Sequence, residues 1–274
     1  MQWLFPKLEK YAPFLAQRFF RLVFYMPTAY RVPEKEKEAE KLARKFSIQV
    51  LGKRVQGYEW GDRSRPYILF IHGWAGRATQ FRKFIQPLNA AGFRMVGFDG
   101  PAHGKSEGTK TTIFQFEAML KTIFSELGQP QAMITHSFGG AAALYSAMNG
   151  LPVRKLINIA SPSIADEILK TYLRAVNGSW TSAQKFKEFV LKITGKPFEE
   201  FTSLYAVQHL PHPVDLLMVQ DEEDQDVYMV HAEELLKIYP RATLHRTTGL
   251  GHTRILKDEK VIERCIEFIR SDAR

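Results

Sequence analysis

The sequence predicts an α/β fold: a mostly parallel central sheet with helices on both faces, a small helical lid and extra N-terminal helices. From residue 46 onward, short apolar runs alternate with segments that repeat apolar residues at helical spacing. The run 67–71 is apolar throughout, as expected of a central strand that is buried on both faces. Such alternation implies parallel strands joined by helices, and 274 residues suit one large domain or one domain with an insertion.

The first 30 residues are rich in aromatic side chains and repeat apolar residues at helical spacing, with Lys10, Gln17 and Arg21 on another face. One interpretation is an amphipathic helix docked on the main domain, which we favour because broad apolar faces usually bury against protein. The other is an interfacial helix, so peripheral membrane contact through residues 1–30 stays open. The apolar stretches are too short to span a membrane, and interrupting charges argue against a signal peptide.

Three regions follow from the pattern along the chain. Residues 33–45 are dominated by glutamate and lysine and predict a solvated surface helix, so we assign 1–45 to an N-terminal helical extension. Residues 164–210 contain no strand pattern and predict a helical lid insertion. The α/β core, with its sheet and covering helices, then comprises 46–163 and 211–274.

Strands are expected wherever a short apolar or alternating run is bounded by turn residues. Two of them pair around Gly52 and Lys53. The predicted strands cover 46–50, 55–60, 67–71, 94–98, 131–135, 154–159, 214–219 and 242–247.

Helices are expected between these strands and throughout the insertion. The predicted helices cover 78–91, 112–127, 138–149, 164–176, 181–194, 198–208, 228–238 and 258–270.

Charge and composition exclude several classes of protein. The net charge is +9, but residues 1–54 hold twelve basic and five acidic residues, so the main domain is nearly neutral and should not bind nucleic acid. The single cysteine, Cys265, allows no intrachain disulfide and favours a cytoplasmic protein. We expect no cofactor and no metal, because the acidic run 221–226 lacks the spacing of a calcium loop and no phosphate-binding loop is present.

Polar and glycine-rich residues follow several predicted strands, and the carboxyl ends of such strands are where open α/β sheets form sites. Ser137 follows the strand 131–135 and precedes Gly139 and Gly140, as expected of a nucleophile on a sharp strand–helix turn. Thr135 departs from the usual G-x-S-x-G pattern. Acidic residues follow the strand 214–219.

These motifs together resemble the α/β-hydrolase family, and in particular its serine esterase and lipase-like members with a helical lid. Residues 72–74 (His-Gly-Trp) are similar to the oxyanion loop, 99–106 to the D-x-x-G-H-G-x-S turn, and 135–140 to the nucleophile elbow. Asp224 matches the acid and 251–252 the histidine loop. The resemblance extends over about residues 46–270. Some lipases of the family also have threonine at the position of Thr135.

The resemblance implies a catalytic triad of Ser137, His252 and Asp224. The serine needs a base within hydrogen-bond reach, and the acid orients the imidazole. Asp221 or Asp226 stays open as the acid in place of Asp224, because the acidic run is crowded.

The backbone N–H groups of Trp74 and Phe138 are expected to form the oxyanion hole. Of the remaining histidines, His103 and His136 are expected to have structural roles. Side chains expected to line the substrate pocket are His72, Trp74, Phe186, Phe189 and Tyr205.

The sequence therefore predicts a serine hydrolase, a carboxylesterase that cleaves a small-molecule ester through an acyl-enzyme. Thioester or C–C bond hydrolysis and perhydrolysis use the same constellation and stay open. A non-catalytic binding protein on the same fold is the alternative of a different class. The expected location is the cytoplasm, with membrane association through residues 1–30 left open.

Overall fold

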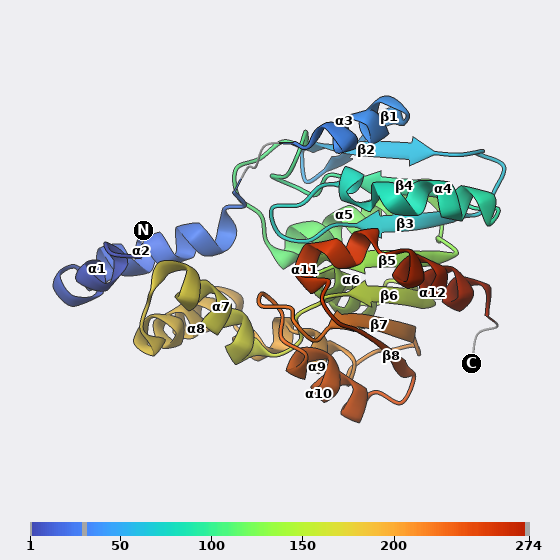
Figure 1. The fold of residues 1–274 in the computed structure, drawn as a ribbon. Helices are drawn as coiled ribbons and strands as arrows, with labels where there is room; N and C mark the ends of the chain where they lie inside the picture. Colours follow the sequence, from blue (N-terminus) through green and yellow to red (C-terminus); the bar gives the residue numbers. More distant parts are fainter. Residues whose placement is uncertain (1, 29–31, 272–274) are drawn as a thin grey trace.

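An eight-stranded sheet forms the centre of the computed structural model, which describes residues 2–28 and 32–271 (Figure 1). The strand order is β1-β2-β4-β3-β5-β6-β7-β8, with β2 antiparallel to both its neighbours and the other pairs parallel. The strands are β1 (Arg44–Val50), β2 (Lys53–Trp60), β3 (Tyr67–Ile71), β4 (Arg94–Phe98), β5 (Ala132–His136), β6 (Lys155–Ile159), β7 (Asp215–Asp221) and β8 (Ala242–Thr247). The predicted mostly parallel sheet is confirmed.

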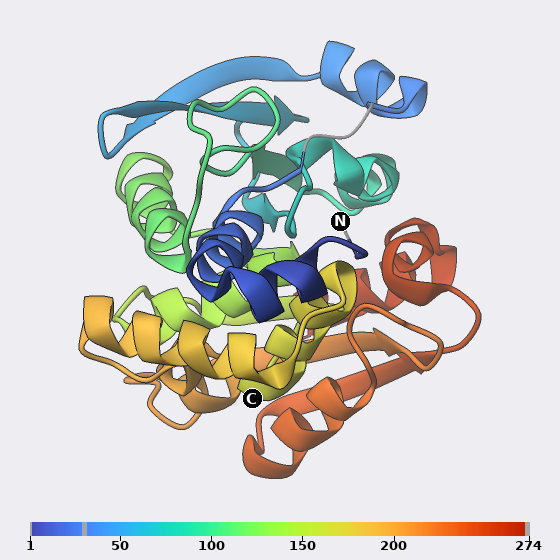
Figure 2. The ribbon, with the colours of Figure 1, turned by 90° about the vertical axis from the view of Figure 1, so that its left-hand side faces the viewer.

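Helices cover both faces of this sheet (Figures 1 and 2). In the buried strand β3, Ile68 and Phe70 face one hydrophobic cluster, whereas Leu69 and Ile71 face the other. The first cluster is completed by η1 (Ala78–Phe81), α4 (Arg82–Ala90), η3 (Ile255–Lys257) and α12 (Glu259–Arg270).

The second cluster lies under three other helices. These are α5 (Ile113–Leu127), α6 (Phe138–Met148) and α10 (Val230–Ile238). Cys265 of α12 is completely buried, and burial raises the pKa of its thiol, as suits a core side chain.

The insertion forms α7 (Ala165–Val176), α8 (Trp180–Thr194), η2 (Phe198–Phe201) and α9 (Ser203–Ala206). A single helix was expected over 198–208, and this expectation is wrong. Thr202 is extended, with φ −105° and ψ 157°, and its hydroxyl accepts a hydrogen bond from the N–H of Tyr205. This cap ends one short helix and begins the next.

The N-terminal segment forms two helices, α1 (Phe5–Tyr11) and α2 (Pro13–Tyr25). Pro13 has no N–H to donate and disfavours helical backbone in the preceding residue, so the helix breaks at Ala12. Both helices lie beside α7 and α8 (Figures 1 and 2). Phe20 contacts Phe186 with ring centroids 5.5 Å apart, so the segment docks on the lid insertion.

A carboxylate of α1 also ties these helices to the lid. Glu9 accepts hydrogen bonds from the N–H and hydroxyl of Ser179, at 3.0 and 2.8 Å, and from the hydroxyl of Ser182 at 2.6 Å. Ser179 is the residue before α8, so an acidic group from α1 supplies the negative charge that a helix N-terminus favours.

The charged helix α3 (Glu34–Lys41) ends earlier than predicted and is not wholly solvated. Glu36 is only 4% exposed. Its carboxylate accepts a hydrogen bond from the Thr79 hydroxyl at 3.1 Å and lies 3.8 Å from the guanidinium groups of Arg77 and Arg82. The two guanidinium groups offset the desolvation cost of burying the Glu36 carboxylate, and these contacts fix α3 on η1.

Replacing Phe20 by Ala should loosen the docking of α2 on the lid. Phe20 has no exposed surface, so its truncation should lower the free energy of unfolding by about 3–4 kcal/mol. Phe14 on the same helix is 68% exposed and provides the matched control, Phe14→Ala, with a loss below about 0.5 kcal/mol. Urea unfolding and limited proteolysis measure both. Equal behaviour of the two variants would contradict the packing described above.

Candidate active site

Ser137 lies between β5 and α6 in a backbone conformation that side chains rarely adopt, with φ 51° and ψ −125°. The turn is crowded by neighbouring backbone. A Cβ at Gly139 would lie 2.5 Å from the carbonyl oxygen of Ile71 and 2.6 Å from that of His72. Glycine is therefore required two residues after the serine, and the turn holds the Ser137 side chain at the carboxyl edge of the sheet.

Thr135, which replaces the first glycine of the usual pattern, is fully buried in β5. Its hydroxyl oxygen lies 2.7 Å from Asn158 Oδ1 and 3.0 Å from the carbonyl oxygen of Ile157. The hydroxyl proton therefore has an acceptor on β6, and the larger side chain adds a contact between two strands without displacing the turn.

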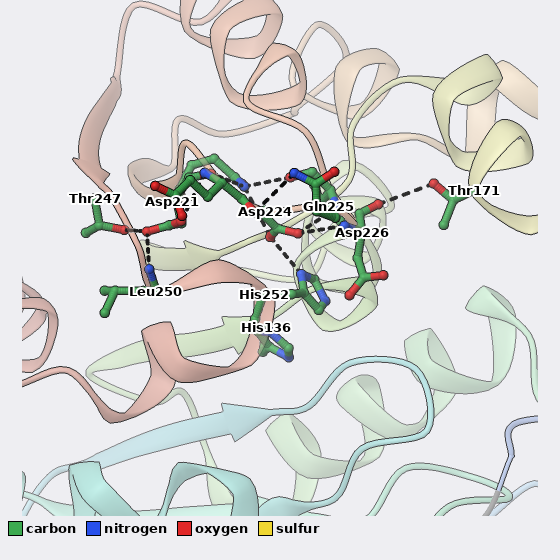
Figure 3. A network of polar contacts seen from close by, with 12 residues as sticks. His136, Thr171, Asp221, Asp224, Gln225, Asp226, Thr247, Leu250 and His252 are labelled. Carbon is green, nitrogen blue, oxygen red and sulfur yellow. Dashed lines mark hydrogen bonds and ion pairs between the residues drawn. The ribbon is translucent and has the colours of Figure 1, made fainter. Parts of the chain in front are cut away.

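His252 and Asp224 form a hydrogen-bonded pair beside this turn (Figure 3). Nδ1 of His252 lies 2.8 Å from Oδ2 of Asp224, and Asp224 is 1% exposed. Burial alone would raise the pKa of Asp224. Hydrogen bonds from His252 and from the N–H groups of Val227 and Asp226, with the charge of His252, outweigh burial and hold this pKa below its ordinary value.

The other ring nitrogen of His252, Nε2, has no protein partner in the described part of the chain. Among residues 2–28 and 32–271, no hydrogen bond to Nε2 occurs, and none within 3.5 Å joins His252 to the Ser137 hydroxyl. An imidazole that donates through Nδ1 keeps a lone pair on Nε2, so this nitrogen can accept a proton.

Asp221, one of the alternative acids, has a different set of partners. Its Oδ2 accepts hydrogen bonds from the Thr247 hydroxyl at 2.7 Å and the Leu250 N–H at 3.0 Å (Figure 3). This carboxylate therefore ties the end of β7 to the loop that carries His252. Asp226, the other alternative, donates its own N–H to Asp224 Oδ1 at 2.9 Å.

Asp224, Asp226 and His252 also place potential metal-ligand atoms within 4.8 Å of one another. Nδ1 of His252 is already used by the hydrogen bond to Asp224, and a metal would have to displace that proton. The arrangement therefore fits an acid–imidazole pair better than a metal site.

His136 makes a contact that the sequence analysis missed. Its Nε2 donates to the backbone carbonyl oxygen of His252 at 2.8 Å, and the two rings lie 4.7 Å apart. Burial and the nearby His252 lower the pKa of His136 to about 3, so its ring is neutral. Since 116 residues separate the two positions, no local pattern in the sequence signals this contact.

The loop after β3 lies directly against the serine. A Cβ at Gly73 would come within 2.7 Å of Ser137 Cβ, so glycine allows the close approach. In the described part of the chain, the N–H groups of Trp74 and Phe138 have no hydrogen-bond acceptor. The Trp74 and Phe138 rings meet edge to face at 5.5 Å.

Two further histidines hold neighbouring loops. His72 donates from Nδ1 to the carbonyl oxygen of Gly73 and accepts at Nε2 from the Gly100 N–H, both at 2.7 Å. His103 accepts at Nε2 from the Ala75 N–H at 3.2 Å. Burial lowers the pKa of His103 to about 4 and the pKa of His72 well below its ordinary value.

His72 is fully buried, so it cannot face a substrate, and we do not retain it in the pocket. Three lid residues expected in the pocket instead pack with other side chains. Phe186 is fully buried against Phe20 and Phe24, Phe189 lies under Arg21 at 4.4 Å, and Tyr205 stacks on His209 with centroids 4.0 Å apart. Of the expected pocket side chains, Trp74 is the one whose ring contacts Phe138, the residue after Ser137.

Comparison with known proteins gives an independent result. A family model described as alpha/beta hydrolase fold matches residues 66–232. "Probable serine hydrolase" of Drosophila melanogaster is 30% identical over 151 residues, which are 53% of this chain and 44% of that protein. This chain therefore covers less than half of the length of that relative.

Two other similarities extend over most of the chain. "Uncharacterized hydrolase YugF" of Bacillus subtilis strain 168 is 27% identical over 85% of this chain and 100% of that protein. The structure of the esterase Pf2001 from Pyrococcus furiosus has a TM-score of 0.66 and 18% identity, covering 89% of this chain and 96% of that one. The latter likeness concerns the fold alone.

The free energy of unfolding should fall between pH 7 and pH 5, because three buried histidines have lowered pKa values. These values are about 4 for His103, about 3 for His136 and about 4 for His231. Below about pH 6.5 these histidines are protonated in the unfolded chain but stay neutral in the folded chain. The free energy of unfolding therefore keeps falling until the pH reaches each folded pKa. The three groups together should remove about 6 kcal/mol by pH 5.

Urea midpoints at the two pH values measure this loss. His72 is likewise buried with a lowered pKa and adds to the loss, so His231→Gln should make the decline about one quarter shallower. The same change at the exposed His209 should leave the decline unaltered. A midpoint that stays constant from pH 7 to pH 5 would show that these histidines are not held neutral.

Proposed function

The chain belongs to the alpha/beta hydrolase fold family, and on this premise we propose that it is a serine hydrolase that cleaves a small carboxylic ester through an acyl-enzyme. Ser137 is the proposed nucleophile, His252 the base and Asp224 the acid. The hydrogen bond of 2.8 Å between His252 Nδ1 and Asp224 Oδ2, beside a serine at φ 51°, is the observation that carries the proposal.

Proton transfer follows from the tautomer that this hydrogen bond favours. Asp224 accepts the Nδ1 proton, so the lone pair of the neutral imidazole is on Nε2. As Ser137 Oγ attacks the carbonyl carbon, Nε2 takes the hydroxyl proton, and it then gives this proton to the departing alcohol. The ionised Asp224 stabilises the imidazolium that exists between the two transfers. Water attacks the acyl-enzyme by the same route and releases the acid.

The negative charge that develops on the substrate oxygen needs donors that are already in position. The N–H groups of Trp74 and Phe138 have no acceptor within the described residues, and Phe138 begins α6, whose N-terminus adds a favourable dipole. One such donor is typically worth about 3–4 kcal/mol in the transition state. Gly73 contributes by letting its loop approach Ser137.

The surroundings favour an apolar acyl group. The half-buried rings of Trp74 and Phe138 meet edge to face beside the serine, and Phe116 packs on Phe138 with centroids 5.0 Å apart. The similar fold of the Pyrococcus furiosus esterase agrees with ester chemistry but does not define the acyl chain. A panel of p-nitrophenyl esters of increasing acyl length would define it.

A fluorophosphonate probe tests the nucleophile directly, because it reacts with a serine that has an activated hydroxyl. Wild-type protein should be labelled and should hydrolyse the esters, and Ser137→Ala should abolish both. Ser161 follows the neighbouring strand β6, and Ser161→Ala is the matched control, which should keep its labelling. Absence of labelling in folded wild-type protein would reject the serine-hydrolase proposal in favour of a non-catalytic binding protein.

The acid is tested by replacing carboxylates with amides of the same shape. Asp224→Asn should lower kcat by about 10⁴-fold, because the amide donates to Nδ1 and favours the wrong tautomer. Asp226→Asn should change kcat less than about tenfold, because its contribution to the pair is a backbone N–H. Steady-state kinetics on one p-nitrophenyl ester compare the two. The opposite ranking would transfer the role of acid to Asp226.

A further inference from the structure

The helix α2 is apolar on two opposite sides. Its inner side is buried, with Ala16 and Phe20 at 1% and 0% exposure. On its outer side Phe14, Arg18 and Leu22 recur every fourth residue, so they share one face, and Phe14 and Leu22 are 68% and 40% exposed. An exposed face on which apolar and basic residues share a helix is typical of a helix that lies at a membrane surface.

The preceding helix continues this exposed apolar surface. Trp3, in the turn before α1, and Tyr11, the last residue of α1, are each 75% exposed. We call the exposed apolar residues of the segment its outer face: Trp3, Leu4, Tyr11, Phe14, Leu15, Leu22 and Met26. Figure 1 shows α1 and α2 projecting with α7 and α8 from one end of the sheet-containing body.

Basic side chains alternate with these apolar residues. The Lys7 ammonium lies 3.4 Å from the centre of the Trp3 ring, the Lys10 ammonium 5.1 Å from that of Tyr11, and the Arg18 guanidinium 6.0 Å from that of Phe14. Each pair puts a cation beside an exposed aromatic ring, which is the composition of a helix at a membrane–water interface.

Few acidic residues are available in this segment to balance its basic side chains. Glu9 is the one acidic residue in positions 2–28, and its carboxylate is occupied by Ser179 and Ser182 of the lid. The outer face therefore carries an uncompensated positive charge. No helix in the described ranges is long and apolar enough to cross a bilayer.

We propose that the outer face binds the surface of an anionic lipid bilayer. The apolar side chains would enter the boundary between headgroups and acyl chains, and Lys7, Lys10 and Arg18 would meet the lipid phosphates. The inner side of the segment stays packed on Phe186 and Glu9 stays bound to Ser179, so the helices dock on the lid and on the membrane at the same time.

A second copy of the chain fits this surface less well. Two outer faces in contact would bring Lys7, Lys10 and Arg18 of both copies into one interface, and like charges in an interface oppose association. Lysine is also depleted from the buried centres of protein interfaces. An anionic bilayer instead offers charge complementarity along the whole face.

Co-sedimentation of the full-length protein with vesicles tests the proposal. Vesicles of phosphatidylcholine mixed with phosphatidylglycerol should bind the protein, vesicles of phosphatidylcholine alone should bind it much more weakly, and added salt should weaken the binding. Lys7→Gln and Lys10→Gln should each lower the partition coefficient about fivefold. Lys260→Gln, an exposed change on α12, is the matched control and should have no effect.

A second pair of variants tests the apolar contribution. Replacing Phe14 and Leu15 together by Ser should lower the partition coefficient at least about tenfold. Leu42 is 81% exposed but lies outside the outer face, so Leu42→Ser should leave the partition coefficient unchanged. Point replacements are preferred to truncation, because removal of α2 would uncover Phe186. Unaltered urea midpoints would establish that the variants are folded.

Three outcomes would overturn the proposal. The first is equal binding by wild-type protein and the outer-face variants, and the second is no binding to either kind of vesicle. The third is a dimer in light scattering that the Phe14 and Leu15 replacements abolish, without vesicle binding. Ser137→Ala should bind vesicles like the wild type, so failure of the catalytic proposal would leave this one standing.

Discussion

The left-handed backbone at Ser137 is the constraint on which the arrangement of the site depends. Such a conformation costs about 1–3 kcal/mol in a residue other than glycine and persists only when the surroundings hold it. Here the buried strand β5 fixes one side of the turn and the buried helix α6 fixes the other. Gly139 lies against the carbonyl oxygens of Ile71 and His72 at the end of β3, and Gly73 lies against the serine, so the same turn requires both glycines.

Two aspartates of the acidic run 221–226 hold His252 in different ways. Asp221 fixes the loop of His252 through its backbone, and Asp224 contacts the imidazole itself. His136 holds the same loop from the opposite side through the carbonyl oxygen of His252. The imidazole is thus positioned by groups from β5, from the end of β7 and from the loop that follows β7.

The sequence was most informative where burial on both faces leaves one choice of structure. The run 67–71 coincides with β3, and the predicted strand 242–247 coincides with β8. Glycines and the serine of the elbow were recognisable because their spacing reflects close backbone approach. Exact partners were harder to predict. Phe186 has the helical spacing of a buried residue, but spacing does not reveal that α2, rather than a ligand, covers it. Glu36 similarly looks solvated until Arg77 and Arg82 come next to it in space.

The carboxylate of Glu9 at the start of α8 has a mechanical consequence. The Glu9 carboxylate accepts three hydrogen bonds from Ser179 and Ser182, and Phe20 packs under α8, so polar and apolar contacts both join the first two helices to the hairpin of α7 and α8. Any hinged opening of that hairpin must carry the amino-terminal helices with it. A surface that binds α1 and α2 would therefore also influence the position of α7 and α8.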